Sequence, residues 1–338
     1  MPEIQLEANP HQVAKDHDSF SFSDSDTDSI LSTACLPKDV TDYETENGRT
    51  YHAFKAGKYP FPNDQKENDR LDFQHHIWSL TMNTTLGLSP PNEQDASPQR
   101  VLDIGTGTGI WAIDYADAHP ESTVIGVDLS PIQPTFIPPN LSFQITDIDD
   151  AWTFTTPFTY IHSRAMNGSI PSWPSFLKKC FDNLTPHGYL ELQDLSIPTS
   201  DDDTLNPDTG LSQAAQLLLD GTTALAHPFI DLPALKPLLK AAGFTAISEE
   251  RYSWPSNTWP RDPRLKEIGA LNCVSMREGI EGMLMGVGTK GLGWSEEDVK
   301  LLAAVAREDL GNRRVHAYWP VTVIYAQKPG VGSSGGSG

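Results

Sequence analysis

Residues 103–112 read DIGTGTGIWA, in which three glycines stand at every second position behind an acid. A short apolar run at 101–104 precedes the glycines, and a run with helical periodicity at 109–119 follows them. Glycine tolerates positive φ and lets a ligand lie against bare backbone, while the first turn of a helix offers free N–H groups to a polar or anionic group. The stretch therefore predicts a ligand-binding loop between a strand and a helix.

Two kinds of ligand fit this loop. A dinucleotide fits because GTGIWA matches G-x-G-x-x-A, with Asp128 as the acid that holds a ribose. S-adenosylmethionine fits because the pattern is also D-x-G-x-G-x-G, with Asp103 in front and Asp128 again on the ribose. Asp103 favours the second ligand, since a carboxylate repels a pyrophosphate and attracts the ammonium group of a methionine moiety. Asp147 and Ile148, after a later apolar run, are placed to hydrogen-bond an adenine amino group and to pack against its ring.

The elements around the loop alternate between strands and helices. The predicted strands are 101–104, 122–128, 141–145, 155–162 and 189–193, and the helices between them are 109–119 and 173–184. This alternation predicts an α/β fold with a mainly parallel, doubly wound sheet. Later helical runs alternate with strand-like stretches at 244–252 and 321–327, which predicts a helical lid within about 200–318, inserted between strands.

Several motifs together resemble one family. They are QHHIW, RVLDIGTGTGIWAIDYAD, VIGVDLSPIQP, YIHSRAMNGSI, GYLELQDL and RRVHAYWPVTVIYAQKP. In this order, from about residue 50 to 328, they resemble class I S-adenosylmethionine-dependent methyltransferases and, more narrowly, the fungal LaeA-like methyltransferases. The resemblance implies a Rossmann-like, seven-stranded sheet whose last strand is antiparallel, in a methyltransferase domain over 99–328. It also implies S-adenosylmethionine as the cofactor.

The resemblance assigns cofactor contacts by motif position. The glycine loop would bind the methionine part, and the acids after the second and third strands would bind the ribose and the adenine. The backbone at the end of the fourth strand would pass near the sulfonium. The residues so assigned are Asp103, Gly105, Thr106, Gly107, Gly109, Asp128, Leu129, Asp147, Ile148, Ser163 and Arg164.

Two segments precede the sheet. Residues 1–45 are acidic and Ser-rich, which predicts a disordered tail. Residues 46–98 contain a predicted helix at 69–88, for which Asn68 or Asp69 is the predicted N-cap.

The resemblance implies that the 46–98 segment covers the cofactor. His76 and Tyr59 are its candidate contacts. The alternatives are a histidine pair on the helix surface and a buried structural tyrosine. At the other end of the chain, the composition of 329–338 predicts a flexible linker.

Candidate catalytic residues follow the fourth predicted strand. His162, Arg164 and Asn167 stand where ligands bind in open α/β sheets, outside the carboxyl ends of the strands. His162 is a candidate base if the acceptor must lose a proton, and a satisfied core histidine is the alternative. An aromatic-lined acceptor pocket would use some of the tryptophans. The candidates are Trp173, Trp254, Trp259, Trp294 and Trp319.

Composition narrows the classes of function. The 338 residues carry a formal net charge of −21, which makes sequence-independent binding to the phosphates of nucleic acid unfavourable. The three cysteines form no CxxC pair, so neither a disulfide framework nor a thiolate metal site is expected. No signal peptide or membrane-spanning run is visible, so a cytoplasmic protein is expected, or a nuclear one if it is regulatory.

The sequence predicts a methyltransferase that acts on the oxygen, nitrogen or carbon of a small molecule, a fungal secondary metabolite. One alternative is a regulator of the same fold that works through protein partners. The other is a nicotinamide-dependent oxidoreductase, which rests on GTGIWA alone.

Overall fold

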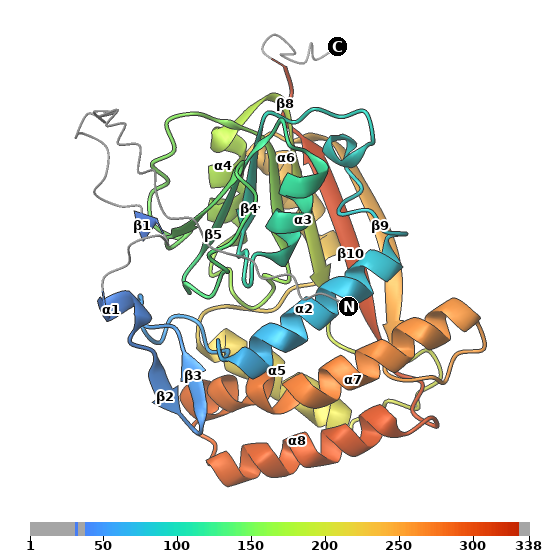
Figure 1. Ribbon diagram of the computed structural model, residues 1–338. Coiled ribbons are helices and arrows are strands. Elements are labelled where there is room, and N and C mark those ends of the chain that lie inside the picture. Colours follow the sequence, from blue (N-terminus) through green and yellow to red (C-terminus); the bar gives the residue numbers. More distant parts are fainter. Residues whose placement is uncertain (1–30, 33–37, 331–338) are drawn as a thin grey trace, which may run out of the picture.

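The computed structural model describes residues 31–32 and 38–330, and its centre is a mixed sheet of eight strands (Figure 1). The strands lie in the order β1-β6-β5-β4-β7-β8-β10-β9. In chain order they are β1 (Leu31–Ser32), β4 (Arg100–Ile104), β5 (Thr123–Asp128), β6 (Leu141–Ile145), β7 (Phe158–Arg164), β8 (Leu184–Leu195), β9 (Thr245–Pro255) and β10 (Tyr318–Gln327).

The strand directions confirm the predicted sheet. β6, β5, β4, β7 and β8 pair in parallel, and β10 runs antiparallel between β8 and β9. Seven strands therefore form the predicted doubly wound sheet with an antiparallel last strand. β1 adds a two-residue antiparallel strand beside β6, at the edge of the sheet.

Helices and a small hairpin surround the sheet. The α-helices are α1 (Lys38–Thr41), α2 (Gln65–Thr81), α3 (Ile110–Ala118), α4 (Trp173–Asn183), α5 (Gly210–Ala224), α6 (Lys236–Ala242), α7 (Pro263–Gly286) and α8 (Glu296–Gly311). The short turns are the 3₁₀-helices η1 (Pro90–Asn92) and η2 (Leu232–Leu235) and the π-helix η3 (Val287–Gly291). The hairpin pairs β2 (Glu44–Glu46) with β3 (Arg49–Tyr51).

The central strands are apolar on both sides because helices cover both faces of the sheet. Leu102 of β4 belongs to a buried cluster with Trp173 of α4 and Leu239 of α6. Its neighbour Val101 points the other way and packs with Trp111 of α3. The strand order and these two layers bring the carboxyl ends of β4, β5, β6, β7 and β8 to one edge.

A third group of helices covers that edge. α2, α5, α7 and α8 lie together below the sheet in the view of Figure 1. Trp78 of α2 meets Trp254 of β9 edge-to-face, with ring centroids 5.0 Å apart. The indole nitrogen of Trp254 also donates to the Thr81 hydroxyl at 2.7 Å. This layer encloses the edge where α/β sheets bind ligands.

The inserted helices differ in detail from the single predicted lid. α5 lies between β8 and β9 along the chain, whereas α7 and α8 lie between β9 and β10. α6 also falls within 200–318, but its residue Leu239 is buried in the hydrophobic cluster that α4 forms with the sheet. The region therefore contains two helical insertions, and α6 belongs to the layer on the sheet face.

The N-terminal boundaries also differ from the predicted ones. α2 begins earlier than expected because Asp64, not Asn68 or Asp69, caps it and accepts from the Glu67 amide at 3.0 Å. The helix ends before Asn83 and Thr84, which both have positive φ. Of the predicted tail, 1–30 and 33–37 lie outside the described residues, whereas 38–45 holds α1 and the start of β2. Of the predicted C-terminal linker, 331–338 lies outside the described residues.

Candidate functional site

The first cavity opens between the carboxyl ends of β4, β5 and β7 and the helix α2, with a volume of about 160 Å³. The glycine loop 105–108 forms one wall, and acids from three successive strand ends face it. The N-terminal segment supplies the opposite wall. The residues contributed by that segment include Lys58, Tyr59, Asn63, Gln74, His75 and Trp78.

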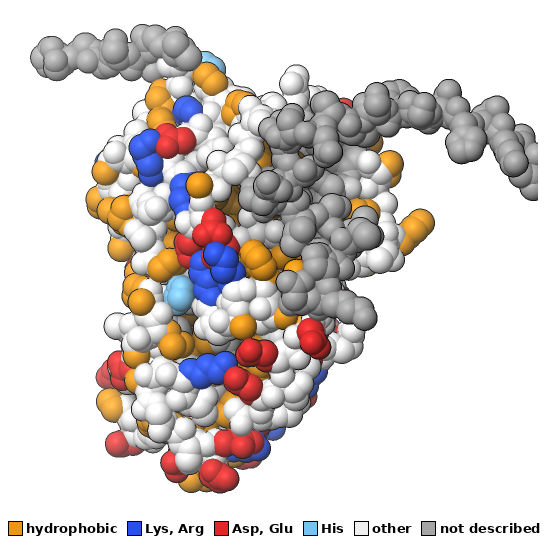
Figure 2. All heavy atoms as spheres, turned by 90° about the vertical axis from the view of Figure 1, so that its left-hand side faces the viewer, with side chains coloured by type: hydrophobic (Ala, Val, Ile, Leu, Met, Phe, Trp, Pro, Cys, Tyr) orange, Lys and Arg blue, Asp and Glu red, His pale blue; other side chains and the backbone are white. Residues whose placement is uncertain are grey.

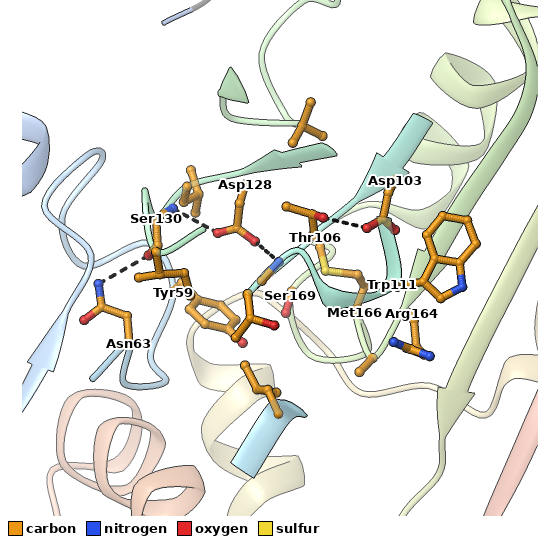
Figure 3. Close-up of a pocket in the computed structure, with 18 of the residues that line it drawn as sticks. Tyr59, Asn63, Asp103, Thr106, Trp111, Asp128, Ser130, Arg164, Met166 and Ser169 are labelled. Carbon is orange, nitrogen blue, oxygen red and sulfur yellow. Dashed lines mark hydrogen bonds between the residues drawn. The ribbon is translucent and has the colours of Figure 1, made fainter. Parts of the chain in front are cut away.

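Asp128 ends β5 and faces Tyr59 across the first cavity (Figure 3). Its two oxygens accept from the backbone amides of Gly107 and Ser130, each at 2.9 Å. Burial raises the pKa of Asp128 to about 6. The carboxylate is thus fixed against the glycine loop and faces the first cavity.

The three loop glycines have two different roles. Gly105 and Gly107 line the first cavity with φ of +68° and +57°. Gly109 does not line it: with φ of +82°, it begins α3 and packs on the ring of Phe143. A Cβ at Gly109 would lie 2.4 Å from that ring. The predicted cofactor contact of Gly109 is therefore replaced by a structural role, which brings α3 close to the sheet.

Asp103 lies in a buried hydrogen-bonded group at the carboxyl end of β4. It accepts from the Thr106 hydroxyl at 2.6 Å and is 2.7 Å from Nδ1 of His162 (Figure 3 shows the Thr106 bond). The His162 ring stacks on Trp111 at 3.6 Å between centroids. His162 lines the first cavity and not the second. This arrangement fixes Asp103 and so supports the interpretation of His162 as a core residue.

Asp147 follows β6, and the N-terminal segment already pairs with it. The ammonium group of Lys58 contacts Asp147 and also lies 2.8 Å from Asp149. Lys58 lowers the pKa of Asp147 below its ordinary value, against the opposing effect of burial. Ile148 and Leu129, which the sequence also assigned to the cofactor, line the first cavity beside it. The Lys58 contact, which the sequence did not predict, joins the segment before α2 to this end of the cavity.

Arg164 lies at the opposite end of the first cavity from Ser130, near Trp111 (Figure 3). It donates to Nδ1 of His75 at 2.7 Å, so the proton of that imidazole is on Nε2, 2.9 Å from Asp114. Burial lowers the pKa of Arg164 to about 10, which still leaves it cationic at neutral pH. Arg164 contributes to the first cavity alone, so its position suits a cofactor contact better than the predicted catalytic role.

Two of the predicted contact residues near Arg164 do not line the first cavity. His75, and not His76, lines the first cavity, because adjacent helical residues point about 100° apart and α2 turns Gln74, His75 and Trp78 inward. Ser163 is buried within β7 and lines neither cavity, so the predicted contact with its backbone stays a prediction. Its side chain alternates with those of its strand neighbours, which face the opposite side of the sheet.

The second cavity adjoins the first and lies under α5 and α7, with a volume of about 160 Å³. Both cavities share Tyr59, Glu67, Leu71, Gln74 and Ala165 as lining residues. The other walls are mainly apolar. They include Leu211, Ala214, Ala215, Leu218, Phe229, Met276, Ile280, Met283, Leu284 and Trp319. Of the five candidate tryptophans, only Trp319 lines this cavity.

Tyr59 and Ala165 lie at the junction of the two cavities. Burial raises the pKa of the Tyr59 hydroxyl above its ordinary value, and the charges of Glu67 and Asp128 raise it further. Ala165 follows β7 directly and has φ of +55°, a conformation that non-glycine residues adopt at a cost of about 1–3 kcal/mol. Such strain occurs most often at functional sites.

Asn167 lines the second cavity, but its side chain is hydrogen-bonded to the backbone of two other segments. Its amide nitrogen donates to the carbonyl oxygens of Ile230 and Leu195, at 2.6 and 3.3 Å. Its amide oxygen accepts from the Ile230 N–H at 2.9 Å. Because both donors are used by the backbone, Asn167 fixes the loop after β7 and does not fit the predicted catalytic role.

Asp194, near the end of β8, lines the second cavity and was not predicted from the sequence. Its oxygens accept from the backbone amides of Asn167 and Leu195, at 2.7 and 2.8 Å. Burial raises the pKa of Asp194 to about 7. The signal that could have found it is the one that marked Asp128, an acid at the carboxyl end of a predicted strand.

The described residues also show whether a metal site, a membrane-spanning helix or a charged surface is present. No group of three or more His, Cys, Asp or Glu in this part of the chain could hold a metal ion. None of the helices within 38–330 is long and apolar enough to cross a membrane. On the face that carries the β2–β3 hairpin, basic side chains lie beside acidic ones (Figure 2). In addition, Arg49 of β3 forms an ion pair with Asp64, the N-cap of α2.

Comparison with known proteins identifies the family. A family model described as a methyltransferase domain matches residues 73–249. The methyltransferase pytC of Aspergillus terreus is 40% identical over 322 residues, which cover 95% of this chain and 97% of that protein. The secondary metabolism regulator LAE1 of Cochliobolus heterostrophus is 38% identical, with 84% and 94% covered. The probable methyltransferase tdiE of Emericella nidulans is 36% identical, with 78% and 82% covered.

The chain therefore belongs to the methyltransferase domain family, in the group that contains these fungal proteins. The resemblance to LaeA-like methyltransferases is confirmed. The family gives no support to the dinucleotide interpretation of GTGIWA. Its members carry the names of both enzymes and regulators, so the choice between these two functions depends on the site.

Proposed function

We propose that the protein transfers the methyl group of S-adenosylmethionine, bound in the first cavity, to a small organic acceptor bound in the second. The adjoining cavities are the observation that carries this proposal. They share Tyr59 and Ala165, so ligands in the two cavities would meet at that boundary. Methyl transfer needs mainly the alignment of two bound reactants, which such an arrangement supplies.

The residues of the first cavity fit S-adenosylmethionine. Asp128 would accept from the ribose hydroxyls, and Gly107, where a Cβ would meet only Leu71 at 3.8 Å, leaves open backbone beside the methionine part. Asp147 and Ile148 would hold the adenine, because the carboxylate has lone pairs beyond those used by Lys58. Arg164 would pair with the methionine carboxylate. When bound, the sulfonium supplies an activated methyl group.

The second cavity favours a small apolar acceptor. Its walls come mainly from leucine, alanine, methionine and aromatic side chains of α5, α7 and β10, as in sites that bury a small organic molecule. The similarity to the methyltransferases pytC and tdiE supports an acceptor from fungal secondary metabolism. The regulator alternative draws support from LAE1, and a cytoplasmic location stays a prediction.

Calorimetric titration with S-adenosylhomocysteine, the unreactive product, tests the first cavity. Asp128→Asn should weaken binding by about 1.5–3 kcal/mol, the range for a hydrogen bond to a charged group. Asp150→Asn is the control, because Asp150 is exposed, pairs with Lys55 and does not line this cavity. Unchanged circular dichroism spectra would show that both variants fold. No binding of either the methyl donor or its product by the wild type would contradict the proposal.

The pH dependence of the same titration gives a second check. Since burial raises the pKa of Asp128 to about 6, the carboxylate that accepts the ribose hydroxyls becomes protonated as the pH falls from 7 to 5. Affinity should therefore decrease over this range in the wild type, and this decrease should be smaller in Asp128→Asn. Transfer of a labelled methyl group to a component of a fungal metabolite extract, followed by mass spectrometry, would then show turnover.

A further inference from the structure

The second cavity contains one acid that has no cationic partner among the described residues. The other acid that lines it, Glu67, forms a bidentate pair with Arg70, with the closest atoms 2.6 Å apart. Asp194 is bound by backbone N–H groups, those of Asn167, Leu195 and Met166. Burying a charge costs free energy unless the charge is both paired and hydrogen-bonded, and Asp194 is hydrogen-bonded but has no partner of opposite charge among the described residues. Buried acids of this kind are candidates for functional residues.

Asp194 also lies next to the junction of the two cavities. Its strand neighbour Gln193 pairs in register with Arg164, which lines the first cavity. The loop that donates to Asp194 contains Ala165, which lines both cavities. The charge of Asp194 also acts on Tyr59, which lines both cavities as well. An acceptor atom beside Asp194 would thus lie close to the methyl donor.

We propose that Asp194 is the general base of the reaction and that the acceptor is an apolar molecule with an ionisable hydroxyl, a phenol or an enol. This inference rests on the function proposed above. The hydroxyl of the acceptor gives its proton to the Asp194 carboxylate, and its oxygen forms a bond to the methyl carbon. The bond between that carbon and sulfur breaks, and its electron pair stays on sulfur. The products are a methyl ether, neutral S-adenosylhomocysteine and protonated Asp194, which returns its proton to water.

The environment of Asp194 suits a proton acceptor at neutral pH. Burial raises the pKa of Asp194 to about 7, and a base works best when its pKa is near the working pH. The charged or titratable groups that line the second cavity with it are Tyr59, Glu67 and Arg70. α5, α7 and β10 contribute only apolar side chains. His162, the base predicted from the sequence, lines the first cavity and not this one.

Binding of 2-naphthol, compared with 2-methoxynaphthalene, tests the proposal without turnover. The two probes share an aromatic body, but only the naphthol can donate a hydrogen bond. Fluorescence titration of the protein loaded with S-adenosylhomocysteine should give at least about tenfold tighter binding of the naphthol at pH 8. This preference should shrink at pH 6, where Asp194 becomes protonated. The naphthol hydroxyl, like that of tyrosine with a pKa of about 10, stays protonated at both pH values.

Two variants locate the effect. Asp194→Asn should lose both the preference for the naphthol and its pH dependence, while it still binds the methoxy probe. Ser196→Ala is the matched control, because it removes another polar group that lines the same cavity and should keep the preference. If Asp194→Asn fails to fold, the pH dependence in the wild type still decides the matter.

Three results would overturn the inference. They are equal binding of the two probes at pH 8, no binding of either, and tighter binding of 1-naphthylmethylamine than of the naphthol, which would indicate an amine acceptor. Failure of the proposed function is a separate result, because it appears as no binding of S-adenosylhomocysteine in the first cavity. The probe titrations can be run without that ligand.

Discussion

Acids at successive strand ends have different tasks because their partners differ. Thr106 and His162 hold Asp103, two backbone amides hold Asp128, and Lys58 pairs with Asp147. Asp194 faces an apolar cavity, and in the described part of the chain it forms no ion pair. The residue type and its place at a strand end were therefore readable from sequence, whereas the task of each acid depends on which groups pack against it.

Arg164 gives a prediction at this scale. Arg164→Met should weaken S-adenosylhomocysteine binding about tenfold to hundredfold, because a hydrogen bond between charged groups is lost. 5′-Methylthioadenosine, which lacks the amino acid part, should bind the variant and the wild type equally well. Calorimetric titration of both ligands separates these effects.

Arg100→Met is the control for this measurement. Arg100 lies at the start of β4, away from the first cavity, with its guanidinium over the Phe158 ring. Its replacement should leave both affinities unchanged. An equal loss of affinity for both ligands in Arg164→Met would refute the assignment of Arg164 to the methionine carboxylate.

At the scale of elements, the start of α3 depends on close contact with the sheet. Gly109→Ala should lower the free energy of unfolding by about 2–5 kcal/mol. A left-handed alanine contributes about 1–2 kcal/mol of this, and the displacement of Phe143 adds about 1–3 kcal/mol.

Gly48→Ala separates the two contributions to that loss. Gly48 also has positive φ, +74°, but a Cβ there would meet nothing within 4 Å. It should lose only the first contribution, about 1–2 kcal/mol. Urea unfolding of both variants checks the difference, and equal losses would show that the contact with Phe143 does not matter.

The sequence predicted that α2 is a helix, but it did not predict which of its residues face the first cavity. The periodicity of this helix indicated that it has a buried side, but His75 and His76 are adjacent and the sequence did not decide between them. The decision comes from partners far along the chain, since His75 contacts Arg164 of β7 and Trp78 contacts Trp254 of β9. The role of Asn167 also depends on a distant partner. Its side chain is held by a hydrogen bond to Ile230, which lies 63 residues further along the chain.

At the scale of the whole molecule, the net charge of −21 should make stability depend on salt. Like charges repel one another in the compact state, and added salt screens this repulsion. The unfolding temperature at pH 8 should rise by a few degrees between 0.05 and 0.5 M NaCl, since about 1 kcal/mol corresponds to roughly 2–4 °C for a protein of this size.

The same measurement near pH 5 is the control for that prediction. The sequence pI is about 4.7, so the net charge and the effect of salt should both be small there. A lower unfolding temperature in high salt at pH 8 would mean that the surface ion pairs contribute more than the overall repulsion.

The sequence by itself determined the helices and strands and the positions of the acids and glycines along them. Strand and helix periods, the glycine loop and the acids at strand ends are local patterns, and a parallel sheet brings its carboxyl ends to one edge whatever follows. Only the tertiary structure decided which side chains meet there. It left Gly109 and Ser163 out of the lining of the first cavity, brought His75 rather than His76 to that lining, and formed a second cavity beside Asp194 from α5 and α7. These outcomes depend on packing between segments far apart in the chain, which no local period encodes.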